Sequence, residues 1–524
     1  MSRPVHRPLV LVTVCLATLS INLDTTIVNV ALPELATSLD AGTRELLWIV
    51  DGYNLAFAAL VLAMGSLSDR FGRRPALVLG LLGFAIATGV AALASTAGQL
   101  VALRFAMGVC AALIFPTTLS IIANTFPDRR ERAAALGAWG ASTGLGVALG
   151  PVSGGWLLEH FTWHSVFWAL VPVALVATAM TLAFVPESRD PAVPRLDLPG
   201  LAVSVAALGL LTHTIIEGPD RGWSSAATLA GFAGALALIS LFVRIERRVE
   251  HPMLDVTLFA DPRFSAASGA VTVAFFALFG FIFLITQYFQ FVRDYSPLGA
   301  GARTIPVALA IAVASALGGV LAPRLGTKAV VSTGLAMLGA SFLWISRSGV
   351  DVDYATVIVP QMVLMGIGLG LVSTPATESI LQVLPPARAG VGSAVNDATR
   401  ELGGTLGVAV IGSIFSSVYA DRLAELLAGS LPSGQLEAAQ DGVAVASAIG
   451  DRVPAVQDAL ATAFMDGLAV GCTVIGVLCL LGALGALLAL PGRRSPRLDA
   501  WPTPQSTSST TAPPSPQSAS APTR

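Results

Sequence analysis

Charged side chains are scarce in this chain. Only 12% of its 524 residues are Asp, Glu, Lys or Arg, whereas 54% are hydrophobic. Soluble globular proteins carry about 25% charged residues. The composition therefore predicts an all-helical polytopic protein whose surroundings are a lipid bilayer. The net charge of −2 identifies no partner, because topology decides where the charges lie, and a nucleic-acid partner is not expected.

Cysteine is equally sparse. The four cysteines, Cys15, Cys110, Cys472 and Cys479, all fall in apolar segments. No Cys-x-x-Cys or Cys/His spacing accompanies them, which argues against a metal site and against a disulfide framework. We interpret these residues as small hydrophobic packing groups.

The sequence also lacks signatures of nucleotide binding and hydrolysis. Neither GxxxxGK[ST] nor GxGxxG follows a strand-like run. No Ser/His/Asp constellation is present either. We therefore expect a protein that is not an enzyme, has no cofactor and uses an ion gradient as its source of energy.

Long apolar segments dominate what is present. A membrane-spanning helix needs about 20 predominantly apolar residues, and fourteen segments reach roughly that length. The first apolar stretch runs from Leu9 to Val30, which is too long for a cleaved signal peptide. The predicted spans are 9–31, 47–67, 76–95, 100–122, 134–157, 164–185, 198–216, 226–244, 267–291, 302–322, 328–346, 355–376, 399–419 and 466–490.

The basic residues support an even number of spans. With a cytoplasmic N-terminus, most of the 30 Lys and Arg residues fall in cytoplasmic loops and tails. This distribution follows the positive-inside rule, so both termini are predicted to be cytoplasmic. Lys328 is the only lysine, a bias that we interpret as that of a GC-rich bacterium, and the expected location is a bacterial inner membrane.

One loop pattern occurs twice. The segment from Gly65 to Arg74 and the segment from Gly319 to Lys328 share Gly, Leu, Arg, Gly and a terminal cation at the same offsets. A short turn that contains Gly and ends in a cation suits a tight cytoplasmic loop between two spans. Its recurrence predicts a duplicated bundle, and duplicated halves with a site at their interface are typical of transporters. Pro323 stands opposite Asp69, so the first copy is the candidate functional one.

The first copy of this loop resembles the loop signature of the major facilitator superfamily. The run from Arg104 to Gly108 is similar to the basic motif of that family, with Met107 where Gln is usual. The run from Trp48 to Tyr53 resembles the fourteen-span drug:proton antiporters of the QacA/EmrB type. The residues that match the antiporter signature of the family's drug exporters are Gly137, Gly146, Gly150, Pro151, Gly154 and Gly155.

The resemblance extends from the first span to Gly403-Gly404 and implies a fold. That fold has two six-helix bundles plus two extra central helices, fourteen transmembrane helices in all. The implied divisions are an N-terminal bundle at 1–190, the extra helices and linker at 191–262, and a C-terminal bundle at 263–495 with a long outer loop at 420–465. The Pro-, Ser- and Thr-rich tail at 496–524 is predicted to be disordered and cytoplasmic.

Three charges lie within predicted spans of the N-terminal half, namely Asp24, Asp51 and Arg104. An ionised group there costs at least about 2.5 kcal/mol on insertion scales, so it usually faces a cavity or a pathway. Asp24 could take a proton or pair with a cationic substrate; alternatively, it bonds Thr25 or Thr26 for packing. Arg104 needs an anionic or carbonyl partner, and Asp24 is a candidate. The resemblance implies that Arg104 is tied to proton coupling, and a structural pair is the alternative.

The glycines of span 134–157 have two interpretations. They permit close helix approach, and Pro151 can kink the helix. One interpretation is a small-residue packing face. The other, which the resemblance favours, is a hinge that biases transport towards export.

Three further acids are candidates for the substrate cavity. Asp51 could line an outer vestibule or be solvated at the interface. Asp397 and Glu401 are four residues apart and share a helix face, with Arg400 one turn from Asp397. They form either an acidic path for cations or an interfacial cluster at a helix N-terminus, where acids are favoured. Some drug exporters of the resembling family carry an acid in their tenth span. Span 302–322 contains none, which weakens any inference from the resemblance that this chain prefers divalent cations.

The first loop copy carries the candidate gate residues. Its charges could form a network in which Asp69 pairs with a helix end or an Arg in one conformation only. The alternative is a merely solvated turn. The residues concerned are Gly65, Asp69, Arg70, Gly72, Arg73 and Arg74.

These features predict a transporter, and the resemblance implies that it is a monomer that exports hydrophobic compounds, cationic ones included, in a proton-coupled process. Two alternatives stay open. The same fold could export a single self-made antibiotic or metabolite, or the chain could be a membrane sensor that does not transport.

Overall fold

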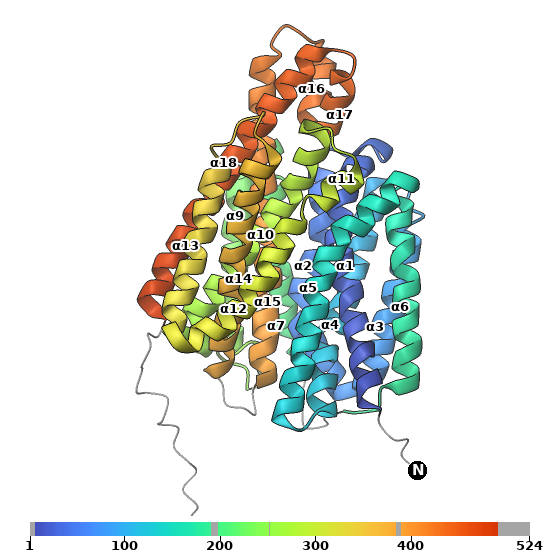
Figure 1. Ribbon diagram of the computed structural model, residues 1–524, viewed down its shortest axis with the longest axis vertical. Helices are drawn as coiled ribbons and strands as arrows, with labels where there is room; N and C mark the ends of the chain where they lie inside the picture. Colours follow the sequence, from blue (N-terminus) through green and yellow to red (C-terminus); the bar gives the residue numbers. More distant parts are fainter. Residues whose placement is uncertain (1–5, 190–196, 251, 384–388, 491–524) are drawn as a thin grey trace, which may run out of the picture.

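The computed structural model describes residues 6–189, 197–250, 252–383 and 389–490 (Figure 1). The regular structure of these residues is helical, as predicted, and they contain no strand. The tail predicted at 496–524 lies outside the described residues. Helices α16 (Ser433–Asp441) and α17 (Val443–Gly450) lie at one end of the bundle, which we name the loop face. The opposite end, where α1 begins, is named the termini face.

Fourteen long helices occur in the part of the chain that the structure describes. Thirteen are long and apolar enough to cross a membrane. The other, α5, is rich in glycine and therefore less apolar, so the count of fourteen spans stays a prediction. The long helices are α1 (Arg7–Ser38), α2 (Thr43–Phe71), α3 (Arg73–Ala91), α4 (Ala97–Thr125), α5 (Arg129–His160), α6 (His164–Phe184), α7 (Leu198–Ile216), α9 (Ala226–Glu246), α10 (Pro262–Gln287), α12 (Ile305–Leu325), α13 (Thr327–Ile345), α14 (Val359–Gln382), α15 (Ala389–Leu426) and α18 (Pro454–Ala489).

Short helices complete the chain. Helix α8 (Gly218–Arg221) joins α7 to α9, and a 3-10 turn, η1 (Val256–Ala260), precedes α10. Helix α10 continues into a π-helical turn, η2 (Tyr288–Val292), which α11 (Pro297–Ala302) follows. A second π-helical turn, η3 (Tyr354–Ile358), leads into α14.

Two sets of six helices repeat the same packing. In the N-terminal half α1 packs on α5, α2 on α4, and α3 on α6. In the C-terminal half α10 packs on α15, α12 on α14, and α13 on α18. The repeated loops occupy equivalent places, because Gly72 ends α2 and Gly326 ends α12. Both glycines have positive φ, 123° and 92°, a conformation that a residue with a Cβ rarely adopts. The loop duplication therefore reflects a duplicated bundle.

The extra pair lies where the two halves meet. Helix α7 packs on α2 of the N-terminal half and on α15 of the C-terminal half. Helix α9 packs on α7 and on the short α8, and its apolar surface is otherwise largely exposed.

The outer loop predicted at 420–465 is shorter in the structure. Helix α15 continues to Leu426 and α18 begins at Pro454, so both project beyond the bundle at the loop face. The hydroxyl of Tyr419 donates to the carbonyl of Ala439 at 3.2 Å, which ties α16 to the end of α15. Composition alone placed the end of α15 too early and the start of α18 too late, because these polar turns are held by contacts with α16 and α17.

Candidate functional site

Asp24 and Arg104 form an ion pair inside the N-terminal half. Nη1 of Arg104, on α4, donates to Oδ2 of Asp24, near the middle of α1, at 2.6 Å. The side chains are 1% and 0% exposed. The hydroxyls of Thr25 and Thr26 donate to backbone carbonyls of α1, and that of Thr26 also to Gly146 of α5, so neither hydroxyl bonds Asp24. Breaking a buried pair by removing one partner typically costs about 3–5 kcal/mol.

Two further groups hold the guanidinium of Arg104. Nε donates to the carbonyl of Ile49 on α2 at 2.9 Å. The guanidinium carbon also lies 4.4 Å from the centroid of the Tyr53 ring, in the geometry of a cation–π contact. The arginine thereby joins α1, α2 and α4, and any change at Asp24 is transmitted to both other helices.

Unpaired carboxylate oxygens remain in the N-terminal half. Oδ1 of Asp24 accepts no hydrogen bond from the described residues. Asp51 is fully buried beside the amide of Asn54, one turn away, but neither side chain reaches hydrogen-bonding geometry with any described residue. The solvated alternative for Asp51 is therefore wrong. A buried ionised carboxylate without a partner is costly, so this position favours a proton or a cationic ligand.

The glycines of α5 let it approach α1 beside Asp24. A Cβ on Gly146 would lie 2.8 Å from Cβ of Asn22, and one on Gly154 would lie 2.7 Å from Cγ1 of Ile27. A Cβ on Gly150 would overlap the hydroxyl of Thr26. The three glycines are spaced by four residues and form one face of α5. This face seals α5 against the turns of α1 on either side of Asp24.

Gly155 and Pro151 make a different contact, with the other half. A Cβ on Gly155 would lie 2.6 Å from Cα of Leu298 in α11, and one on Gly301 would overlap the carbonyl of Pro151. Nearby, Thr286 of α10 donates to the carbonyl of Asn29 at 2.9 Å. Both contacts lie towards the loop face. The two halves are thus closed against each other at the loop face.

Residues 14–408 match the model of the Major Facilitator Superfamily. The chain belongs to this superfamily. It is accordingly a multi-pass membrane transporter and not an enzyme.

Proteins similar to this chain are named as drug-efflux or antibiotic-resistance proteins. It is 35% identical over 485 residues to the multidrug efflux pump LfrA of Mycolicibacterium smegmatis, covering 92% of this chain and 95% of LfrA. It is 33% identical over 395 residues to the methylenomycin A resistance protein of Streptomyces coelicolor, covering 75% of this chain and 83% of that protein.

A solved structure supports the fold. The facilitator matches a bacterial homologue of the human lysosomal transporter Spinster with a TM-score of 0.63. The match covers 95% of this chain and all of that one at 18% identity. This likeness supports the two-bundle architecture.

The acids of the facilitator's C-terminal half lie on α15. Asp397 is buried, and one of its oxygens, Oδ2, has no partner among the described residues. The predicted neighbour Arg400 makes no ion pair with it; its guanidinium lies 4.4 Å from the ring centroid of Phe275. Glu401 is half-buried and close enough to Tyr53 for an electrostatic interaction. Glu401 of the C-terminal half therefore lies near the ring that holds Arg104 in the N-terminal half.

The candidate gate loop is structured within the N-terminal half. Nε of Arg73 donates to Oδ1 of Asp69 at 2.7 Å, and the amide of Arg73 donates to the carbonyl of Ser188 at 2.9 Å. Arg74 donates to the carbonyl of Leu182. Arg70 lies beside the ring of Phe71, 5.6 Å from its centroid. Gly65 packs against Pro116 of α4. In this conformation the described contacts of the loop stay within one half.

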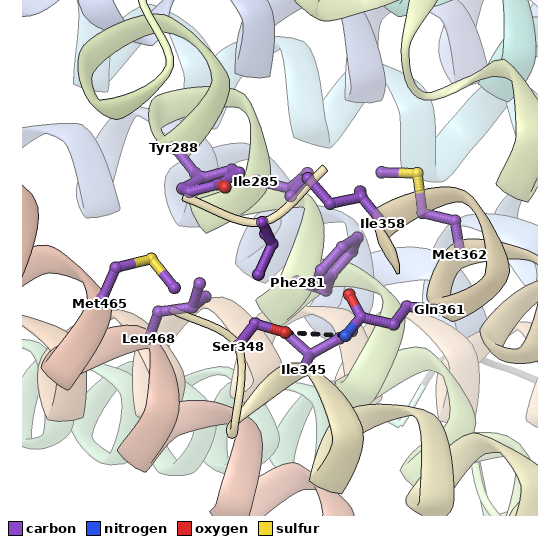
Figure 2. A pocket seen from close by; sticks show the side chains of 11 residues that line it. Phe281, Ile285, Tyr288, Ile345, Ser348, Ile358, Gln361, Met362, Met465 and Leu468 are labelled. Carbon is purple, nitrogen blue, oxygen red and sulfur yellow. Dashed lines mark hydrogen bonds between the residues drawn. The ribbon is translucent and has the colours of Figure 1, made fainter. Parts of the chain in front are cut away.

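A small cavity lies apart from this interface, between α10, α13, α14 and α18 (Figure 2). Its volume is about 20 Å³, with an apolar lining that includes Phe281 and Met465. Gln361 donates to the hydroxyl of Ser348 at 2.8 Å on its wall. A space of this size holds about one water molecule, so it is too small for a transported drug.

Several groups at the site are not evident from sequence motifs. The carbonyl of Ile49, the ring of Tyr53 and the α11 turn at Gly301 contact the predicted residues. Conversely, no described atom outside its own helix lies within 4 Å of the Cβ position of Gly137. This glycine therefore belongs neither to the contact of α5 with α1 nor to the contact of α5 with α11. Gly137 precedes Gly146 by nine residues, which places it on the opposite side of a helix with about 3.6 residues per turn.

Proposed function

We propose that the chain exports hydrophobic drugs or antibiotics, cationic ones included, in exchange for protons across a bacterial inner membrane. In this proposal it is a monomeric, fourteen-span drug:proton antiporter with both termini in the cytoplasm. The termini face is then cytoplasmic and the loop face is outside. The names of the relatives support efflux of drugs.

The buried pair of Asp24 and Arg104 carries this proposal. The bond to the arginine at 2.6 Å favours the anionic form of the Asp24 carboxylate. Protonation of Asp24 would weaken the pair and release the guanidinium to Ile49 and Tyr53. Since α5 packs on the same turns of α1, a change at Asp24 would reach the seam between the halves. The proton would in this way favour one conformation over the other.

The remaining acids would select the substrate. Asp51, Asp397 and Glu401 carry negative charge or a dissociable proton at the interface of the halves. A lipophilic cation could neutralise one of them and displace its proton. The gate loop and the glycine seams would then alternate access between the two faces, with Asp69 changing its partner during the cycle.

The test is ethidium efflux from cells that express the wild type or Asp24→Asn. The wild type should extrude ethidium, and an uncoupler should stop it. Asp24→Asn should insert normally and fail to extrude the dye. Extrusion that continues in the presence of the uncoupler would rule out proton coupling.

A dedicated exporter of one self-made antibiotic is the second candidate. The similarity to a methylenomycin A resistance protein favours it. A panel of chemically unrelated dyes and antibiotics separates the two, because a dedicated exporter should protect cells against one chemical class only.

A further inference from the structure

The extra helices carry a pair of buried acids at the termini face, far from the site above. Asp197 precedes α7 and Glu246 ends α9; they are 7% and 3% exposed. Each carboxylate uses one oxygen for the backbone. Oδ1 of Asp197 accepts from the amide of Gly200 at 2.9 Å, and Oε2 of Glu246 accepts from the amide of Leu254 at 3.0 Å.

The second oxygen of each acid is buried and has no partner. These atoms are Oδ2 of Asp197 and Oε1 of Glu246. A methyl group built on Gly200 would lie 2.5 Å from the first and 2.7 Å from the second, so both oxygens approach one point. Two unpaired carboxylate oxygens this close repel each other unless a cation or a shared proton lies between them.

The described protein supplies no such cation. Among residues 6–189, 197–250, 252–383 and 389–490, no basic side chain forms an ion pair with either acid. The charges that act on Glu246 come from Asp197 and Asp255, which are both acidic. The N-terminus of α7 contributes about half a positive charge, which is less than the two carboxylates require.

We propose that Asp197 and Glu246 bind a divalent metal ion, of which Mg²⁺ is the fitting one. Mg²⁺ is commonly held by one or two carboxylates while keeping several of its water molecules. The ion would join the first turn of α7, the last turn of α9 and the segment after α9 that leads to the C-terminal half. The site does not depend on the direction or the energy source of transport.

The test uses the purified full-length protein and Mn²⁺ as a paramagnetic probe for Mg²⁺. Electron paramagnetic resonance should detect one saturable Mn²⁺ site, which Mg²⁺ displaces. At a metal concentration a hundredfold above half-saturation, the apparent melting temperature should rise by about 3 °C or more.

Three variants locate the site. Asp197→Asn and Glu246→Gln keep an oxygen for the backbone amides and remove the charge, so each should weaken Mn²⁺ binding at least about tenfold. Gly200→Ala keeps both charges and places a methyl group at the meeting point, so it should also abolish binding. Asp353→Asn is the matched control. Its carboxylate caps η3 near the loop face by accepting from the amide of Thr356, and binding should be unchanged.

Two results would overturn the proposal. One is Mn²⁺ binding that does not saturate, or that survives all three variants. The other is stabilisation by lowering the pH from 7 to 5 without any effect of Mn²⁺, which would assign a shared proton to the two carboxylates instead of a metal ion.

Discussion

The two halves share a scaffold and differ in chemistry. In both, glycines let the fifth helix of the half approach the first: Gly150 contacts α1, and Gly407 contacts the backbone of α10 at Phe276. Among the described residues, only the N-terminal half adds a buried ion pair beside its glycine contact. In the C-terminal half, Arg400 lies over the ring of Phe275 and forms no ion pair with a described acid, although it acts electrostatically on Asp397 and Glu401. Duplication thus explains the helix packing, whereas the charges are particular to each half.

Removing one arginine from each half should give the largest contrast. Arg104→Gln leaves Asp24 buried without its partner, which should destabilise the protein by about 3–5 kcal/mol and reduce efflux at least about a hundredfold. Arg400→Gln loses a cation–π contact of about 0.5–1 kcal/mol at a half-buried position. Efflux per inserted molecule and the melting temperature measure both. Equal losses in the two variants would mean that the ion pair has no special role.

Substitution of a glycine at the α5–α1 contact and at the α15–α10 contact should lower the stability by similar amounts. Gly150→Ala and Gly407→Ala each force a methyl group into a neighbouring helix, and we expect a loss of about 1–3 kcal/mol in stability from overpacking. Gly137→Ala is the matched control on α5, because nothing lies within 4 Å of its Cβ position. Its stability should be unchanged or slightly higher. Thermal unfolding in detergent is the measurement, and a destabilised Gly137→Ala would contradict the assignment of the seam.

Neutralising one acid in each half tests whether Asp51 and Glu401 select cationic substrates. If they select cations, Asp51→Asn and Glu401→Gln should each reduce efflux of a lipophilic cation about tenfold, or about 1.4 kcal/mol. Efflux of a neutral drug of similar size should change much less. Initial rates for a matched cation and neutral compound test this, and equal losses for both compounds would assign the acids to coupling or folding.

The smallest effect is expected at the aromatic ring under Arg104. Tyr53→Phe keeps the ring and loses only a long contact, 3.5 Å, to the carbonyl of Ile21, so efflux should stay within about twofold. Tyr53→Leu loses the π face and should reduce efflux about fivefold. In the C-terminal half, Phe275→Leu should have no effect on coupling. A transport assay at several uncoupler concentrations distinguishes the Tyr53 variants from Phe275→Leu.

The sequence predicted the helices well because membrane spans are set by length and apolar composition. It also predicted the partner of Arg104, since a buried cation needs an anion and Asp24 is the acid of the first span. The positions of the helix ends were harder to predict from the sequence, as the extensions of α15 and α18 show. The carbonyl of Ile49 and the α11 contact could not be predicted, because backbone groups carry no sequence signal.

For the glycines of α5, the sequence motif and the helix geometry give different groupings. The resemblance grouped Gly137 with Gly146, Gly150 and Gly154, although helical periodicity places it on the other side of the helix. Asp51 is the opposite case. Its place near a helix end suggested solvation, and packing by neighbouring helices buries it completely.

The position of α7 has a consequence for how a fat-soluble compound reaches the interior. A two-bundle transporter has two seams along its sides, here between α2 and α15 and between α5 and α12. Helix α7 covers the first of them. On the other side, no described helix packs on both α5 and α12, so a molecule dissolved in the lipid should enter more readily between α5 and α12 than past α7.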